Sequence, residues 1–371
     1  MKIIHIVLGK ANPERMNGVN KVAYQLATAQ TKLEHNVTLW GIANSLKKNY
    51  PQRIFKTQLF LQIKNKFTLH RKLKDALNAL EPETIVHLHG AFIPEFYHIV
   101  KRLNKKSIDY IYTPHGSLTE MAMTKNRVLK KNYFKFIEST IIANAKKVQL
   151  LGINEFSYLD NLTSKANKCL IANGQDLAEI PEYVAKKDHK SAPVFGFCGR
   201  LATFHKGLDL MFYGFQRYIQ NGGIGTLELI GDGSDRTALT NLASDLGIAD
   251  RVIFHGKKFG KEKYDLLHKM DVFLHTSRME GFPTAVLEAA ALKIPTITSE
   301  ATNINNYVCQ YQSGFLLKEN SPEEIGLRMT TALDYHQQEK LIKMGENGRK
   351  MVEQEFDWQQ IASKLVQVYS A

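Results

Sequence analysis

The sequence predicts an α/β protein built from two doubly wound domains. Its 371 residues exceed one ordinary domain, because domains average roughly 150 residues. Short β-branched runs alternate with amphipathic helical stretches, the pattern of a parallel sheet with crossover helices. This alternation occurs twice along the chain, so we expect two such domains.

The expected strands are short runs rich in β-branched residues. In the first half they occur at 2–9, 36–42, 84–90 and 108–114, and in the second at 192–200, 226–233, 251–256, 271–277 and 294–300. A helix is expected over 19–33, where apolar residues recur at helical spacing. The polar stretch 179–191 separates the two sets and is typical of a linker. We therefore expect domains at 1–185 and 186–355, with a last helix at 356–371.

The composition indicates a globular protein of the cytoplasm. No apolar run approaches the roughly 20 residues that span a bilayer. The apolar stretch at the N-terminus is closed by Lys10 and lacks a small-residue cleavage site, which favours a first strand over a signal peptide. The three cysteines form no CxxC pattern, so we expect reduced, structural thiols.

The excess of positive over negative charge lies entirely in the first half. Residues 1–185 hold 27 lysines and arginines against 14 acidic residues, a net charge of +13, and residues 186–371 hold 22 of each. The first half should therefore meet something anionic: a nucleic acid, a phospholipid surface or a phosphorylated substrate. No motif that reads DNA or RNA occurs, so a nucleic-acid-binding protein is a remote alternative.

Two basic stretches, 47–75 and 125–147, interleave lysines and arginines with aromatic and aliphatic residues. Basic amphipathic helices of this kind lie on anionic membranes. The alternative is that the aromatic residues enter the core while the lysines are merely solvated.

The sharpest signal for chemistry follows the expected strand at 271–277. The loop RMEGFP contains Glu280, and the helix that follows it, with Pro283 at its first position, contains Glu288. Open parallel sheets bind ligands at the carboxyl ends of their strands, and a helix N-terminus attracts anions. Two carboxylates across this junction can accept hydrogen bonds from sugar or ribose hydroxyls.

A second signal lies at 195–211. One strand ends at Gly199-Arg200, and Lys206-Gly207 opens the next helix. A guanidinium and an ammonium at the mouth of one sheet suit a diphosphate, although surface cations at helix ends would look the same. Glycine-rich turns at 230–236 and 254–256 add little, and no P-loop supports a kinase or ATPase.

In the first half, Gly18 precedes the helix at 19–33 and can let backbone N–H groups reach a phosphate. His115 follows a strand and precedes a glycine, which favours a functional role over a structural one. His87 and His89 share one strand face, but no companion ligand completes a metal site, so they are expected to pack or to line a pocket.

Together these motifs resemble the retaining GT-B glycosyltransferase family of bacterial capsule, lipopolysaccharide and exopolysaccharide enzymes. The resemblance covers the whole chain and rests on Gly18, 114–116, 173–176, 199–200 with 206–207, and 280–288. Two departures are Asn17, where family members often have a second glycine, and Pro283, where they often have glycine. The implied fold is GT-B: two Rossmann-like domains facing a central cleft, with the last helix crossing back to the first domain.

The resemblance implies metal-independent, retaining transfer of a sugar from a UDP- or GDP-sugar. The acceptor would be a glycan or a polyprenyl-diphosphate-linked saccharide of cell-surface polysaccharide biosynthesis, at the inner face of the cytoplasmic membrane. No cofactor is implied, and a sugar-nucleotide epimerase or phosphorylase on the same fold is the alternative. The implied catalytic residues are His115, Arg200, Lys206 and Glu280. The implied donor-binding residues are Gly18, Arg200, Lys206, Glu280, Gly281, Phe282, Pro283, Thr284 and Glu288.

Overall fold

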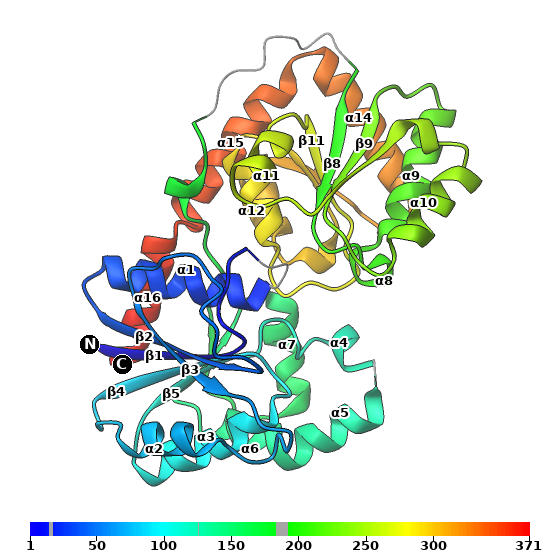
Figure 1. The fold of residues 1–371 in the computed structure, drawn as a ribbon. Coiled ribbons are helices and arrows are strands. Elements are labelled where there is room, and N and C mark those ends of the chain that lie inside the picture. The colour runs from blue at the N-terminus through cyan, green and yellow to red at the C-terminus, as the bar shows by residue number, and fades with distance from the viewer. Residues whose placement is uncertain (15–17, 125, 183–191) are drawn as a thin grey trace. The chain divides into compact units, whose positions relative to one another are not determined.

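A computed structural model describes residues 1–14, 18–124, 126–182 and 192–371. The chain forms two compact units: unit 1 is Met1–Asn173 with Trp358–Ala371, and unit 2 is Gly174–Asp357. The predicted domain boundary at 185–186, most of the predicted linker, Asn17 and Lys125 lie outside the described residues. Each unit is a parallel sheet with helices on both faces (Figure 1).

The sheet of unit 1 has seven parallel strands in the order β3-β2-β1-β4-β5-β6-β7. Their bounds are β1 Lys2–Leu8, β2 Asn36–Ala43, β3 Lys56–Leu61, β4 Thr84–His89, β5 Tyr110–Thr113, β6 Lys147–Leu150 and β7 Lys168–Leu170. The four strands expected in this half are present as β1, β2, β4 and β5. The strands β3, β6 and β7 were not expected.

Helices cover both faces of this sheet. Figure 1 shows α1 and α16 on one face and α2, α3 and α6 on the other. The bounds are α1 Gly18–Lys32, α2 Arg71–Asn78, α3 Pro94–Lys105, α4 Glu120–Thr124, α5 Arg127–Tyr133, a π-helical turn Phe134–Glu138, α6 Ser139–Ala143, α7 Ile153–Leu162 and α16 Trp358–Ser370. The C-terminal helix α16 packs on α1, and its Trp358, Ile361 and Leu365 enter the same apolar cluster as Val22 and Leu26.

The two basic stretches differ in structure. The expectation of a basic amphipathic helix is wrong for 47–75, because Lys56–Leu61 forms the edge strand β3 and buries Phe60 against Trp40. Within 125–147, the described residues are mostly helical, and Phe134 is buried while Phe136 is exposed. The alternative, that the aromatic residues enter the core, therefore holds for Phe60 and Phe134 and does not hold for Phe136.

Unit 2 contains a six-stranded parallel sheet in the order β10-β9-β8-β11-β12-β13. Its strands are β8 Val194–Cys198, β9 Thr226–Ile230, β10 Val252–Gly256, β11 Val272–His275, β12 Thr296–Thr298 and β13 Gly314–Leu316. Its helices are α8 Thr203–Lys206, α9 Leu208–Gln220, α10 Arg236–Asp245, α11 Gly260–Leu267, α12 Thr284–Ala291, α13 Asn305–Tyr311, α14 Pro322–Gln337 and α15 Lys340–Glu355. All five strands expected in this half are present.

Both sheets reverse their strand order beside their first strand. In unit 2, β8 lies between β9 and β11. The chain therefore adds β9 and β10 on one side of β8, and β11, β12 and β13 on the other side. A doubly wound sheet binds its ligand at this switch point, outside the carboxyl ends of the two strands. The predicted fold class, two Rossmann-like units with a returning C-terminal helix, is confirmed. Among the described residues, no helix is both long enough and apolar enough to cross a membrane.

Candidate active site

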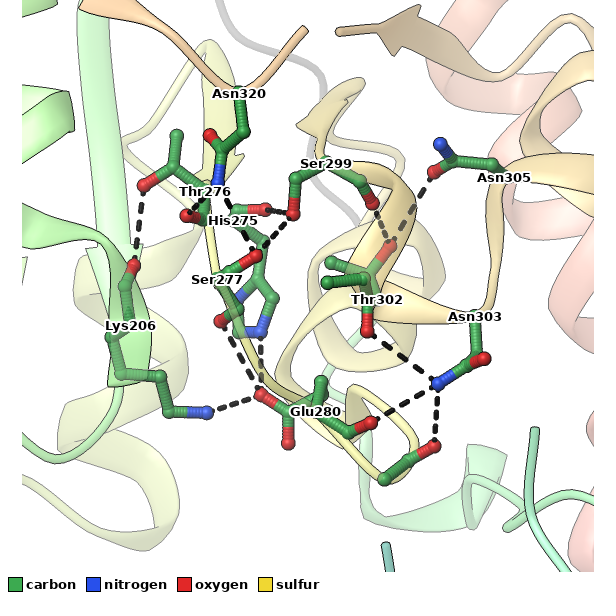
Figure 2. A network of polar contacts seen from close by, with 12 residues as sticks. Lys206, His275, Thr276, Ser277, Glu280, Ser299, Thr302, Asn303, Asn305 and Asn320 are labelled. Carbon is green, nitrogen blue, oxygen red and sulfur yellow. Dashed lines mark hydrogen bonds and ion pairs between the residues drawn. The ribbon is translucent and has the colours of Figure 1, made fainter. Parts of the chain in front are cut away.

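The carboxyl end of β11 gathers the polar groups of unit 2 around Glu280. The Lys206 ammonium forms an ion pair with the Glu280 carboxylate, and His275 Nε2 lies 3.1 Å from the same oxygen. The Ser277 hydroxyl is 3.4 Å from it. Figure 2 shows these three side chains converging on one carboxylate oxygen. Lys206 follows β8 and Glu280 follows β11, so the pair lies at the switch point of the unit 2 sheet.

The surroundings keep Glu280 ionised. Burial favours the protonated form, but the Lys206 charge and the hydrogen bond from His275 outweigh it and lower the pKa of Glu280 to about 2. Burial also lowers the pKa of His275. His275 is therefore neutral at physiological pH and donates its Nε2–H to the carboxylate. The result is a fixed negative charge beside a fixed positive charge.

Asparagine side chains hold the loop that carries Glu280. The Asn303 amide donates to the backbone carbonyls of Glu280 and Gly281, both at 3.1 Å. The Asn320 amide donates to the Thr276 carbonyl at 2.9 Å, and the Ser299 hydroxyl donates to the Ser277 carbonyl at 2.6 Å. Figure 2 shows these contacts reaching the loop from neighbouring segments. The loop is therefore held in one conformation by groups from beyond β12 and β13.

Lys206 reaches Glu280 because of a sharp junction between two helices. The expectation that Lys206-Gly207 opens a helix needs correction: Lys206 ends α8, and Gly207, with φ +60°, separates α8 from α9. A Cβ on Gly207 would lie 2.0 Å from the Thr276 carbonyl oxygen. The Thr276 hydroxyl donates to the Gly207 carbonyl at 3.0 Å. Only glycine allows this close approach of the junction to the loop after β11.

An arginine just before Glu280 ties the same loop to α9. Arg278 forms two hydrogen bonds of 2.7 Å with the two carboxylate oxygens of Asp209. Its backbone N–H also donates to the His205 carbonyl at 3.0 Å. Bidentate pairs of this kind fix orientation as well as distance.

The helix after the loop begins one residue later than expected. Pro283 is the N-cap of α12, with Thr284 as its first residue, rather than the first helical residue. Phe282 is buried and its ring lies 5.3 Å from that of Phe356, whereas Gly281 and Thr284 are half-buried. Of these predicted donor-binding residues, Phe282 packs into the unit, and Gly281 and Thr284 stay partly accessible.

Glu288 has an ionic partner different from that of Glu280. It is buried on α12, and Lys263 from α11 lies 2.8 Å from its carboxylate. Burial alone would lower the pKa of Lys263, but the Glu288 charge outweighs it and the pKa is raised. Glu288, one of the predicted donor-binding residues, is thus one half of a buried ion pair.

Two of the residues predicted to bind phosphate, Arg200 and Gly18, are solvent-exposed. The Arg200 side chain, after β8, is exposed and forms no ion pair among the described residues. Gly18 is the first residue of α1 rather than the residue before it, and a Cβ there would meet nothing within 4 Å. Neighbouring side chains therefore do not require glycine at position 18.

His115 belongs to unit 1, in the loop after β5, and has a left-handed backbone with φ +54°. Its Nε2 lies 3.1 Å from Nδ1 of His89. His87 and His89 do line the unit interior, and His5 on β1 joins them. Among the described residues, these three offer ring nitrogens within 4.8 Å of one another, close enough for a metal ion. The expected metal independence stays a prediction.

Several residues of the site were not singled out from the sequence. His275 and Lys263 are partners of the two predicted glutamates, and Asn303 and Asn320 hold the loop. The only available signal was the position of His275 at the end of a strand that leads to Glu280. The asparagines come from later segments, and no local pattern marks them.

The arrangement in unit 2 has a definite chemical capacity. The cations Lys206 and Arg200 and the N-terminus of α12 favour a diphosphate. The ionised Glu280 can accept hydrogen bonds from hydroxyls beside it. A group whose negative charge grows as it leaves is stabilised by such preorganised cations.

Similarity to known proteins places this fold among the glycosyltransferases of the GT-B class. The family described as Glycosyl transferases group 1 matches residues 179–351, and Glycosyltransferase Family 4 matches residues 16–149. The chain belongs to this family of glycosyltransferases.

Named relatives agree with this assignment. The O-antigen biosynthesis glycosyltransferase WclY of Escherichia coli is 26% identical over 290 residues, covering 75% of this chain and 80% of WclY. An uncharacterized glycosyltransferase of Haemophilus influenzae is 24% identical over 347 residues, covering 91% and 92%. The structure of Anabaena Alr3699/HepE in complex with UDP and glucose superposes with a TM-score of 0.76 at 16% identity, covering 100% of this chain and 99% of HepE. That likeness supports the fold.

Proposed function

We propose that this glycosyltransferase moves a sugar, with retention of its anomeric configuration, from a UDP- or GDP-sugar to a saccharide acceptor in cell-surface polysaccharide biosynthesis. The observation that carries the proposal is the Lys206–Glu280–His275 cluster at the switch point of unit 2. The name of WclY, which refers to O-antigen biosynthesis, supports the acceptor class. The UDP and glucose bound to HepE support a UDP-sugar as the first donor to test.

In this proposal each side chain has a role. Lys206 and Arg200 neutralise the leaving diphosphate, and Glu280 binds the donor sugar through its hydroxyls. Glu288 binds the ribose, with Lys263 as the counter-charge that keeps it ionised. His115 is the group of unit 1 that contacts the reacting sugar. Gly18 lets backbone N–H groups at the start of α1 approach a phosphate.

The test is a nucleotide-sugar screen followed by a transfer assay. The correct donor should raise the melting temperature, because a ligand that binds only the folded state stabilises it by mass action. Transfer to a lipid-linked saccharide should then give a product whose anomeric proton has the configuration of the donor. An inverted product would overturn retention, and no transfer from any UDP- or GDP-sugar would overturn the donor class.

The same assay without acceptor separates the alternatives. An epimerase would convert the nucleotide sugar itself, and a phosphorylase would require inorganic phosphate. Product that appears only with a saccharide acceptor supports the transferase.

We also propose that the transfer needs no metal ion, because Lys206 and Arg200 supply the positive charge at the diphosphate. Treatment with EDTA should then leave the rate unchanged. A rate that falls with EDTA and returns with Mn²⁺ or Mg²⁺ would contradict the proposal.

We further propose that unit 1 docks on an anionic membrane through the helical segment 127–136. Val128, Leu129 and Phe136 expose 75%, 69% and 67% of their surfaces, far more than apolar side chains that pack in a core. The basic residues Arg127, Lys131 and Lys135 are exposed beside them. An apolar patch rimmed by cations matches an interface of acyl chains and anionic headgroups.

Lys130 does not belong to this surface. Its ammonium donates to the Ala122 carbonyl and lies 5.2 Å from the Phe92 ring centre. The test variant therefore reverses Arg127, Lys131 and Lys135 to glutamate. Each cation contributes roughly 1 kcal/mol near an anionic surface, so sedimentation with phosphatidylglycerol vesicles at low salt should be lost.

The matched control makes the same charge change in unit 2, with Lys318, Lys340 and Lys350 reversed to glutamate. It should still sediment with the vesicles. Wild-type protein that ignores anionic vesicles at low salt would overturn the membrane proposal and leave the transferase assignment untouched.

A further inference from the structure

A continuous chain of hydrogen bonds runs through unit 1 from a backbone carbonyl to His115. It contains eight bonds of 2.6–3.1 Å. It crosses the sheet from β6 through β5, β4 and β1 and uses one side chain each from α1 and α16. The members in order are Ile171, Gln149, Thr113, His87, Tyr369, Gln30, His5, His89 and His115.

The direction of the chain is set at its first member. The Ile171 carbonyl can only accept a hydrogen bond, so the Gln149 amide NH₂ must face it, at 2.9 Å. The Gln149 oxygen then faces Thr113, whose hydroxyl donates to it at 2.8 Å. Because that hydroxyl proton is used, the Thr113 oxygen must accept from His87 Nε2–H at 2.7 Å.

The same reasoning passes through the returning helix. With its proton on Nε2, His87 has a bare Nδ1, so the Tyr369 hydroxyl donates to it at 2.6 Å. The Tyr369 oxygen can then only accept from Gln30, whose NH₂ lies 3.0 Å away. Burial raises the pKa of Tyr369, so the phenol keeps its proton.

The last three members are histidines. The Gln30 oxygen accepts from His5 Nε2–H at 2.7 Å, which leaves His5 Nδ1 bare. His89 Nε2–H therefore donates to His5 Nδ1 at 2.9 Å, and His89 Nδ1 is bare in turn. His115 must then donate its Nε2–H to His89 at 3.1 Å.

This assignment requires each imidazole to carry one proton, and burial ensures it. Burial lowers the pKa of His5 to about 4 and that of His115 to about 3. It also lowers the pKa values of His87 and His89 far below their usual range. Each ring is thus one donor and one acceptor at neutral pH.

We propose that this chain holds His115 as the Nε2–H tautomer, so that its bare Nδ1 accepts a hydrogen bond from a substrate hydroxyl. The last clause rests on the proposed function, but the tautomer does not. Gln149, Thr113, Tyr369 and Gln30 are positioning residues in this scheme, since they act only through the histidines. The C-terminal helix α16 supplies Tyr369, so its position in unit 1 contributes to this hydrogen-bond chain as well as to packing.

Tyr369 is the member to remove. In Tyr369→Phe, the Gln30 amide loses its fixed acceptor and can rotate by 180°. His5 and His89 can then reverse, and His115 can take up the Nδ1–H tautomer. Tyr110→Phe is the matched control, because Tyr110 is also a buried tyrosine of unit 1 that donates one hydrogen bond, to the Ile141 carbonyl outside the chain.

The experiment is nitrogen NMR of histidine-labelled protein without substrate, with the His115 signals assigned by their loss in His115→Asn. Wild type and Tyr110→Phe should show one tautomer of His115, with Nε2 protonated and Nδ1 bare. Tyr369→Phe should show a mixture. Its kcat should fall by about twofold to tenfold if the competent tautomer drops to between half and a tenth, with KM unchanged.

Three results would overturn the proposal: a protonated Nδ1 on wild-type His115, a single unchanged tautomer in folded Tyr369→Phe, or a metal ion on the ring nitrogens of His5, His87 and His89. If Tyr369→Phe does not fold, the wild-type spectrum decides alone. If wild type shows the Nε2–H tautomer and Tyr369→Phe shows a mixture but turns over as fast as wild type, the hydrogen-bond chain is upheld and only the contact with a substrate hydroxyl is excluded.

Discussion

The pairing of Glu280 with Lys206 shows how one residue can be both charged and buried. The carboxylate accepts from Lys206, His275 and Ser277, so its low pKa is a product of its neighbours. A carboxylate with this many donors cannot rotate freely toward a ligand. It presents its second oxygen in a fixed direction, which is what recognition of a sugar hydroxyl requires.

Replacing Glu280 with glutamine tests this charge. Glutamine keeps the shape, but it removes the counter-charge of Lys206 and half of the acceptor capacity. We expect kcat/KM for the donor to fall by about 10²-fold or more, the loss typical of one preorganised charged group. Glu319→Gln, at an exposed position of unit 2, is the control and should be silent. Unchanged kinetics in a folded Glu280→Gln would exclude Glu280 from the site.

The two cations are tested by Lys206→Ala and Arg200→Ala. Each should reduce donor turnover by on the order of 10²-fold, because charge that develops on the leaving diphosphate loses a partner. Lys269→Ala removes an exposed lysine of the same unit and serves as the control. Near-normal turnover in both variants, with intact folding, would refute the diphosphate clamp.

At the scale of elements, the site depends on one glycine between two helices. Gly207 lets α8 end and α9 begin within one residue, against the Thr276 carbonyl. The junction sets the position of Lys206, and Thr276 is four residues before Glu280. The two halves of the ion pair are therefore aligned by the same backbone contact.

We expect Gly207→Ala to displace this junction. Alanine with positive φ costs roughly 1–2 kcal/mol, and here its Cβ would also collide with the Thr276 carbonyl. Gly247→Ala is the matched control, since Gly247 has φ +67° with nothing within 4 Å of its Cβ. Urea unfolding should show the larger loss of stability for Gly207→Ala, and only that variant should lose transfer activity. Equal losses would show that the close contact is unimportant.

Much of this element layout was predictable. Strands buried on both faces, such as β4 and β11, are runs of β-branched and apolar residues, and this pattern located them. The edge strand β3 was missed because its residues Lys56–Leu61 lie inside a basic segment and are mostly exposed or half-buried, with only Phe60 buried. The strands β7 and β13 have three residues each and contain no β-branched residue, unlike β12, whose three residues are Thr296, Ile297 and Thr298.

The site was predictable only in part, for a physical reason. Glu280, Lys206 and Arg200 follow strands, so topology brings them to one edge. The pairing of Lys206 with Glu280 and of Lys263 with Glu288 depends on how helices pack, which no local pattern records. The chain that ends at His115 joins Gln30 to Tyr369 across 339 positions, and only the folded unit reveals it.

At the scale of the whole molecule, unit 1 has several ionisable side chains in its interior. Unit 1 buries His5, His87 and His89, half-buries His115, and also buries Glu138 and Glu155. Burial raises the pKa of both glutamates to about 7. Both tryptophans of the chain, Trp40 and Trp358, are buried in unit 1, so tryptophan fluorescence reports the unfolding of this unit alone.

These groups act on stability in opposite directions. The histidine pKa values are lower in the folded state than the usual 6.5, so the stability they contribute is complete above pH 6.5 and is lost as the pH falls toward about 4. The glutamate pKa values are higher than the usual 4.5, so their contribution is complete below pH 4.5 and is lost as the pH rises toward about 7. Between pH 4.5 and 6.5 both sets differ in protonation between the folded and unfolded states, so the larger of the two effects sets how stability changes with pH.

We expect the four histidines to dominate the two glutamates in that window. Near pH 5.5 the unfolded histidines bind protons that the folded ones exclude, and the folded glutamates hold protons that the unfolded ones release. Unit 1 should therefore take up about two protons on unfolding, and its unfolding free energy should fall by about 3 kcal/mol for each pH unit of acidification.

Urea unfolding followed by tryptophan fluorescence at several pH values measures this slope. Glu138→Gln should steepen the slope, because it removes a proton that is released on unfolding. His5→Gln should flatten the slope, because it removes a proton that is taken up on unfolding. A slope near zero, or stability that rises on acidification, would show that the buried histidines are not held neutral, and the tautomer assignment of His115 would fail with them.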